Sequence, residues 1–158
     1  MATILMALLS WVHILAAVLW LGGGAFFTFL VVPNLTGLQP PDAGKVSGAI
    51  SKKFTPLVLL SAAVLAITGI LRMYLTGSLN PGYLFSTSGV TLLLKLLVYV
   101  VILVVAHLIT TTAKTLEEGS SPEVAMAAQK RIALLSKTNI ALMVIVILLA
   151  SGSRYGGF

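Results

Sequence analysis

The sequence contains no cysteine and few acidic residues. Of its 158 residues only 9% are charged, and four acids (Asp42, Glu117, Glu118 and Glu123) stand against ten lysines and arginines. Without cysteine the protein cannot form disulfides, iron–sulfur clusters or thiolate metal sites. Because 58% of the residues are hydrophobic and the mean hydropathy is +1.07, too few polar groups remain to cover a soluble surface. We expect residues 1–158 to form a single integral membrane domain.

Several functional classes lack their usual sequence features. The net charge is +6, but the basic residues are scattered and form no stripe, so no nucleic-acid partner is expected. No carboxylate lies in an apolar run to act as a base in hydrolysis. The glycine triplet at 22–24 lacks the strand-turn-helix context of a dinucleotide site. The N-terminus has no basic region before its apolar run, which exceeds the length of a signal sequence, so we expect this run to be retained.

Four apolar runs predict an all-α fold, a polytopic up-down bundle of four membrane helices. A membrane helix needs about 20 apolar residues, because the hydrocarbon layer is about 30 Å thick. The runs cover residues 4–33, 57–76, 90–113 and 132–150. Prolines and a glycine predict a loop over 34–41, and residues 42–54 have the pattern of a short amphipathic interfacial helix. Ser121-Pro122-Glu123 is a typical helix start, with Gly152 a reasonable stop.

The distribution of positive charge predicts the orientation in the cell membrane. Seven cations lie on or near the first and third loops (Lys45, Lys52, Lys53, Lys114, Lys130, Arg131 and Lys137), and three lie on the other side (Arg72, Lys95 and Arg154). By the positive-inside rule, both termini of this multi-pass protein are predicted on the outer side.

The stretch SWVHILAAVLWLGGGAFF carries the first candidate site. His13, Trp20 and Gly24 recur at helical spacing, so they share one face of the first span. The glycines allow a neighbouring helix or a planar ligand to approach the backbone. An imidazole at this depth needs a partner, which leaves three interpretations of His13: a histidine hydrogen-bonded to another helix, a ligand, or a proton carrier.

Two cations break the apolar pattern of the later spans. Arg72 lies near the end of the second span, where it could also snorkel to the interface, and Lys95 lies within the third span between apolar neighbours. No span contains an acid that could pair with them. An exogenous anion would resolve this imbalance, and a heme supplies two propionates.

His107 lies about 12 Å deeper than His13 on a simple count of helical rise, so ligation of one heme by both histidines is awkward. It could instead ligate a second group, carry protons, or bond to Ser136 or Asn139 of the last span.

The segment SWVHILAAVLWLGG resembles the first helix of CopD-type copper resistance proteins. LLLKLLVYVVILVVAH is similar to the third helix of HemJ-type protoporphyrinogen oxidases of the same broad superfamily, and RIALLSKTNIALMVIVILLA is placed where that family has its fourth helix. The HemJ resemblance implies a four-helix protein that binds heme b. It implies that His13 is an axial ligand, that Arg72 holds a propionate, and that Lys95 is either the opposite metal ligand or a second propionate partner. The glycine triplet and the terminus SGSRYGGF are closer to CopD.

Two functions therefore stay open. One is a b-type heme protein, either an electron-transfer cytochrome or an oxidoreductase acting on a quinone or a porphyrinogen, with Trp20, Gly24 and His107 as further cofactor-binding candidates. The other is CopD-like copper uptake or binding, for which His13 with Met73 could make a small site although the methionines are dispersed. Expected partners are the lipid bilayer and a quinone or redox protein, and small residues on the first span allow a homodimer.

Overall fold

The computed structural model describes residues 2–117 and 121–152, and these are helical apart from short connections. Four helices in the described ranges are long and apolar enough to cross a membrane, and no strand occurs there. The all-α prediction is therefore confirmed, and the chain is a multi-pass membrane protein in contact with the bilayer. Arg154 and most of the SGSRYGGF segment lie outside the described residues.

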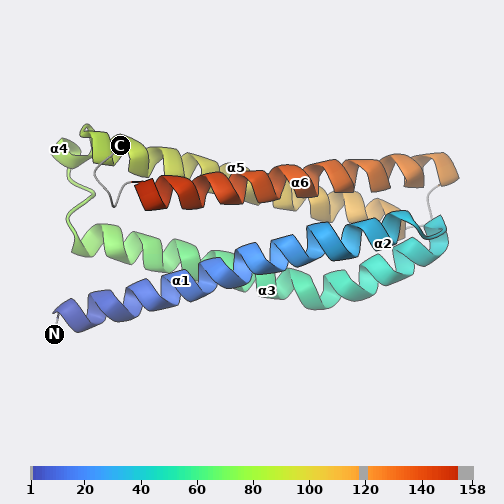
Figure 1. Ribbon diagram of the computed structural model, residues 1–158, viewed down its shortest axis with the longest axis horizontal. Helices are drawn as coiled ribbons and strands as arrows, with labels where there is room; N and C mark the ends of the chain where they lie inside the picture. Colours follow the sequence, from blue (N-terminus) through green and yellow to red (C-terminus); the bar gives the residue numbers. More distant parts are fainter. Residues whose placement is uncertain (1, 118–120, 153–158) are drawn as a thin grey trace.

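The long helices run side by side in alternating directions (Figure 1). The first comprises α1 (Ala2–Phe26), the π-helical turn η1 (Phe27–Val31) and α2 (Val32–Thr36), and the others are α3 (Pro40–Leu75), α5 (Thr87–Glu117) and α6 (Pro122–Gly152). A short α4 (Pro81–Leu84) lies in the uncharged connection before α5. The start of α1 and the end of α6 lie at the same end of the bundle (Figure 1). We call this the terminal end and the opposite end, where α2 leads into α3 and α5 into α6, the basic end.

The second span extends much further than its apolar run. The segment 42–54 is helical as predicted, but it is not a separate interfacial element, because α3 continues without a break through Pro56. Proline removes one backbone hydrogen bond, a loss that membrane helices tolerate when neighbouring groups compensate. Lys52 and Lys53 are exposed on this part of α3, as the amphipathic pattern predicts. Lys45 forms an ion pair with Asp42 at 3.9 Å near its start.

The prediction of a loop over 34–41 was wrong, because the connection between the two helices is shorter. The helix continues through Pro33 to Thr36, and α3 already begins at Pro40. At η1 the N–H of Val32 bonds to the carbonyl of Phe27, a spacing of five residues in place of four. This wider turn immediately precedes Pro33, which has no N–H to donate, so the helix passes the proline instead of ending there.

The bundle interior contains two apolar clusters. The larger, in the middle, is formed by Ala16, Trp20, Ala62, Leu65, Ile102 and Met143. The smaller, near the basic end, is formed by Val32, Ala113, Ala125, Ala128 and Ile132. Many large apolar side chains face outward, among them Trp11 at 66% and Leu15 at 62% exposure. Such a surface is suited to lipid and not to water.

Candidate functional site

His13 is held between α1 and α3 by a hydrogen bond to Thr68. The imidazole Nδ1 and the Thr68 hydroxyl oxygen are 2.7 Å apart. The His13 ring also lies beside Gly69, because a Cβ placed on this glycine would be 3.7 Å from Cε1 of His13. The Nδ1–Cε1 edge of the imidazole thus faces α3, and the ring is about half-buried.

The Thr68 hydroxyl determines which ring nitrogen carries the proton. Thr68 donates its single proton to the carbonyl of Val64, one turn earlier, at 2.6 Å. Its oxygen must therefore accept from His13, so the proton of the neutral imidazole is on Nδ1. Nε2 then keeps a free lone pair. This is the arrangement by which proteins orient a metal-binding histidine through its other nitrogen.

Arg72 and Lys95 lie at nearly the same depth as His13. Arg72 is one turn beyond Thr68 on α3, toward the terminal end. Lys95 is one turn from Tyr99 on α5, and the Tyr99 hydroxyl donates to the carbonyl of Ala62 at 2.7 Å. Counting helical rise from these contacts places Lys95 within about 3 Å of the His13 level along the bundle. Both cationic side chains are half-buried. The terminal half of the bundle therefore gathers one imidazole and two cations.

Trp20 and Gly24 lie deeper, about 10 and 16 Å from His13 toward the basic end. Trp20 is 4% exposed, and its ring packs against Tyr99 with centroids 5.5 Å apart. A Cβ on Gly24 would be 3.2 Å from Cδ1 of Ile140 and 3.3 Å from Sδ of Met143. The glycine thus permits close packing of α1 on α6. A cofactor role for Trp20 and Gly24 stays a prediction.

His107 is separated from His13. It is exposed on α5, two turns beyond Tyr99 toward the basic end, and counting through Tyr99 and Ala62 puts the two histidines about 20 Å apart along the bundle. They cannot bind one metal ion together. A hydrogen bond from His107 to Ser136 or Asn139 is not formed, because Ser136 Oγ and Asn139 Oδ1 have no hydrogen-bond partner among the described residues. A role for His107 at a second group stays a prediction.

Two thioethers lie between His13 and the terminal end of the bundle. Met6 lies two turns before His13 on the same face of α1, and Met73 lies one turn after Gly69 on the facing side of α3. Both are half-buried and lie toward the terminal end. Within the described ranges there is no cluster of three or more histidine, cysteine or acidic side chains that could hold a metal. A metal at His13 would therefore not find two further histidine, cysteine or acidic ligands beside it among the described residues.

Three buried polar atoms lack partners in the described part of the bundle: Trp20 Nε1, Ser136 Oγ and Asn139 Oδ1. Ser136 and Asn139 lie on successive turns of α6, and both are more than nine-tenths buried. Thr28 of η1 donates to the carbonyl of Ser136 at 3.4 Å, so these side chains lie where α6 meets the first span. With Met143 beside Gly24, the contact between α1 and α6 contains both polar and sulfur groups.

Thr68 and Tyr99 were not identified from the sequence. Both are one helical turn from an identified cation, Thr68 from Arg72 and Tyr99 from Lys95. A search for polar residues four positions from each intramembrane charge would have found them.

The comparisons with known proteins gave one match. The family model CopD, "Copper resistance protein D", matches residues 48–152, which include Thr68, Arg72 and Lys95 but not His13. No curated protein and no solved structure matches the chain.

Proposed function

The chain belongs to the CopD family of copper resistance proteins, and we propose that it binds copper inside the bilayer with His13 as the nitrogen ligand. The observation that carries the proposal is the hydrogen bond between His13 and Thr68. It holds the ring between two helices and leaves the Nε2 lone pair for a metal. Imidazole nitrogen and thioether sulfur are both suitable copper ligands. Met73 and Met6 are the sulfur ligands proposed beside it.

The deeper contact between α1 and α6 supports movement of copper along the bundle. Met143 Sδ lies against the Gly24 position, and Asn139 Oδ1 and Ser136 Oγ follow toward the basic end without partners. After a copper ion leaves His13, these groups would offer it further oxygen and sulfur ligands. Copper is thus the proposed cargo of this protein and not a resident cofactor.

Heme b is a second candidate function, favoured by Arg72 and Lys95. Two cations lie near the His13 level, and both are half-buried in the terminal half of the bundle. In this candidate His13 would bind the heme iron, Arg72 would hold a propionate, and Lys95 would be either a second iron ligand or a second propionate partner. A bound heme would supply one-electron redox chemistry to an electron-transfer protein or an oxidoreductase.

The two candidates predict opposite effects when a cation is removed. A copper ion at His13 is repelled by Arg72 and Lys95, so the Arg72→Gln and Lys95→Leu variants should bind Cu(I) more tightly. Removing one nearby charge changes the binding free energy by about 1–2 kcal/mol, equivalent to about 5- to 30-fold. Heme propionates are attracted by the same cations, so the variants should bind heme more weakly by a similar factor. Cu(I) affinity is measured by anaerobic chelator competition, and heme affinity by the Soret band.

Lys53→Gln is the matched control for these charge changes. Lys53 is an exposed lysine of α3, about 22 Å from Thr68 on a count of helical rise, so its removal should leave both affinities unchanged. A fall in Cu(I) affinity in Arg72→Gln and Lys95→Leu, together with an unchanged control, would count against copper at this site.

The Thr68→Val variant tests the orientation of His13. Valine keeps the shape of threonine but removes the oxygen that accepts from Nδ1, so the ring is free to turn or change tautomer. Loss of such a partner typically costs 10- to 100-fold in metal affinity, and we expect about 10-fold weaker Cu(I) binding. The control is Thr110→Val, which removes a comparable hydroxyl, one that donates to the carbonyl of Ala106 at 2.9 Å. Equal affinities of Thr68→Val and the wild type would show that Thr68 does not orient the ligand.

A further inference from the structure

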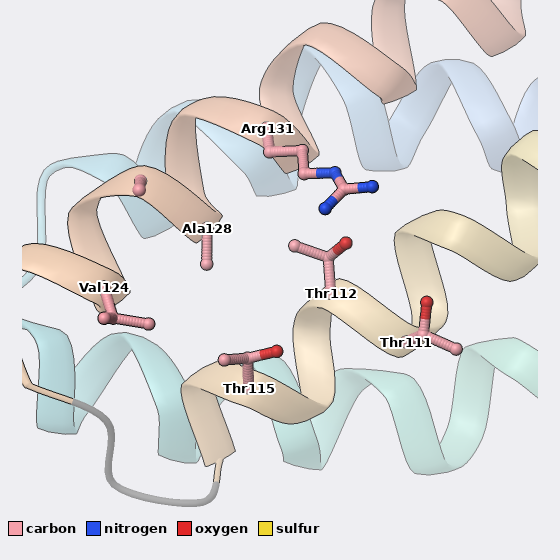
Figure 2. Close-up of a pocket in the computed structure, with 7 residues that line it drawn as sticks. Thr111, Thr112, Thr115, Val124, Ala128 and Arg131 are labelled. Carbon is pink, nitrogen blue, oxygen red and sulfur yellow. The ribbon is translucent and has the colours of Figure 1, made fainter.

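A cavity at the basic end lies away from His13 and plays no part in the proposed copper function. It lies between α5 and α6 and has a volume of about 430 Å³, within the range of small-molecule sites. Its lining includes Thr111, Thr112, Thr115, Val124, Ala128 and Arg131. Figure 2 shows the Arg131 side chain reaching from α6 toward Thr112, with Thr111 and Thr115 on the same part of α5.

The cavity lies where headgroups meet the bundle. Arg131 directly precedes the apolar run of α6, and Thr112 lies at the end of the apolar run of α5. Lys114 and Lys130 are exposed nearby on the same helices. No ion pair joins Arg131 to an acid among the side chains that the structure describes. Basic pockets between membrane helices at this level are typical binding places for anionic lipid headgroups.

The threonines favour one kind of anion over others. The hydroxyls of Thr111 and Thr112 both donate to the carbonyl of Leu108, at 3.1 and 2.7 Å. Their protons are used inside the helix, so they offer oxygen lone pairs to the cavity. A ligand whose polar atoms are all phosphate oxygens could not form hydrogen bonds with these threonines, because both sides would offer only acceptors. A ligand with one anionic phosphate and free hydroxyl groups would satisfy both Arg131 and the threonines.

We propose that this cavity binds the headgroup of a phospholipid that carries a phosphodiester and hydroxyl groups, such as phosphatidylglycerol. Arg131 binds the phosphodiester in a forked hydrogen bond, and Thr111 and Thr112 accept from the glycerol hydroxyls. Val124 and Ala128 also line the cavity, on the side of Arg131 that faces away from the apolar run of α6.

Native mass spectrometry of the detergent-purified full chain tests the proposal. Phosphatidylglycerol should be retained about 10-fold better than phosphatidylcholine, and Arg131→Gln should remove this preference. The matched control is Lys130→Gln, which removes the same charge one residue away, outside the cavity lining, and should keep it. Equal losses in the two variants would mean attraction by general positive charge and would overturn the site.

Two further measurements separate the headgroup from other anions. Thr112→Val should weaken the binding of phosphatidylglycerol about threefold and leave the binding of phosphatidic acid, which has no headgroup hydroxyl, unchanged. Equal weakening of the binding of both lipids would contradict the role of the hydroxyls. Glycerol 3-phosphate and inorganic phosphate at millimolar concentration should not displace the lipid. Displacement by either would identify a soluble phosphate site instead. Circular dichroism and the elution volume of each variant establish that it is folded.

Discussion

Replacing His13 with alanine should lower the Cu(I) affinity of the purified protein by about 100-fold or more. Loss of a residue that only orients a ligand already costs about 10- to 100-fold, and this change removes the ligand itself. The remaining candidate ligands, Met73 and Met6, are thioethers, which bind copper without the basic nitrogen that His13 supplies. Anaerobic competition with a chromogenic Cu(I) chelator measures the affinity. If the protein is instead loaded with heme, the Soret band should be lost or strongly altered.

The control for this experiment is the other histidine. His107 is exposed on α5, about 20 Å from His13 along the bundle, so His107→Ala should bind Cu(I) as the wild type does. If both variants lose affinity equally, copper is not held at a defined position near His13. If neither loses affinity, His13 is not a ligand and the proposed copper site is wrong.

Enlarging Gly24 should give the largest loss of stability. A Cβ at this position already lies 3.2 and 3.3 Å from Ile140 and Met143, and the Gly24→Leu variant adds three more carbons at the same contact. Overpacking of this kind costs about 1–3 kcal/mol, because α6 must move or its side chains must leave their rotamers. For a chain of this length the melting temperature should fall by about 3–10 °C. Thermal unfolding in detergent, followed by circular dichroism, measures it.

Gly22 provides a matched control within the same triplet. A Cβ on Gly22 meets nothing within 4 Å, so Gly22→Leu adds an apolar side chain to an open surface and should unfold no earlier than the wild type. A stable Gly24→Leu protein would mean that α1 and α6 are less closely packed than these contacts require. If that stable protein also lost copper or heme, Gly24 would be a binding residue, as the sequence pattern suggests.

The apolar runs were sufficient to predict the four helices, because a membrane span has a nearly fixed minimum length. The start of α6 at Pro122 was also recognisable, since proline and an acid favour a first turn. The continuity of α3 through Pro56 was not recognisable from the sequence. Pro56 and the lysines before it are typical of a break, and whether a helix passes a proline depends on neighbouring helices. The π-helical turn at Phe27–Val31 has the same origin, because it depends on how the first span accommodates Pro33.

The candidate site was predictable where it breaks the hydrophobic pattern. His13, Arg72 and Lys95 are conspicuous because ionisable groups are rare inside membranes. Thr68 is not conspicuous, since threonine is common in membrane helices and commonly bonds to its own backbone. Its importance comes from the register of α1 against α3, which places its oxygen 2.7 Å from His13. The register of one helix against another depends on how their side chains pack. The periodicity of residues within one helix does not predict it.

The depth of His13 also makes binding of a cation sensitive to the membrane potential. His13 is nine residues from Ile4, where the apolar run begins, so an ion bound there lies about 14 Å into a layer about 30 Å thick. A monovalent ion arriving from the terminal end therefore crosses about half of the electric field. At about 2.3 kcal/mol per charge for each 100 mV, half the field is worth about 1.1 kcal/mol, or roughly sevenfold in affinity. A potential that is negative at the basic end would draw Cu(I) to His13, and collapse of that potential would release it.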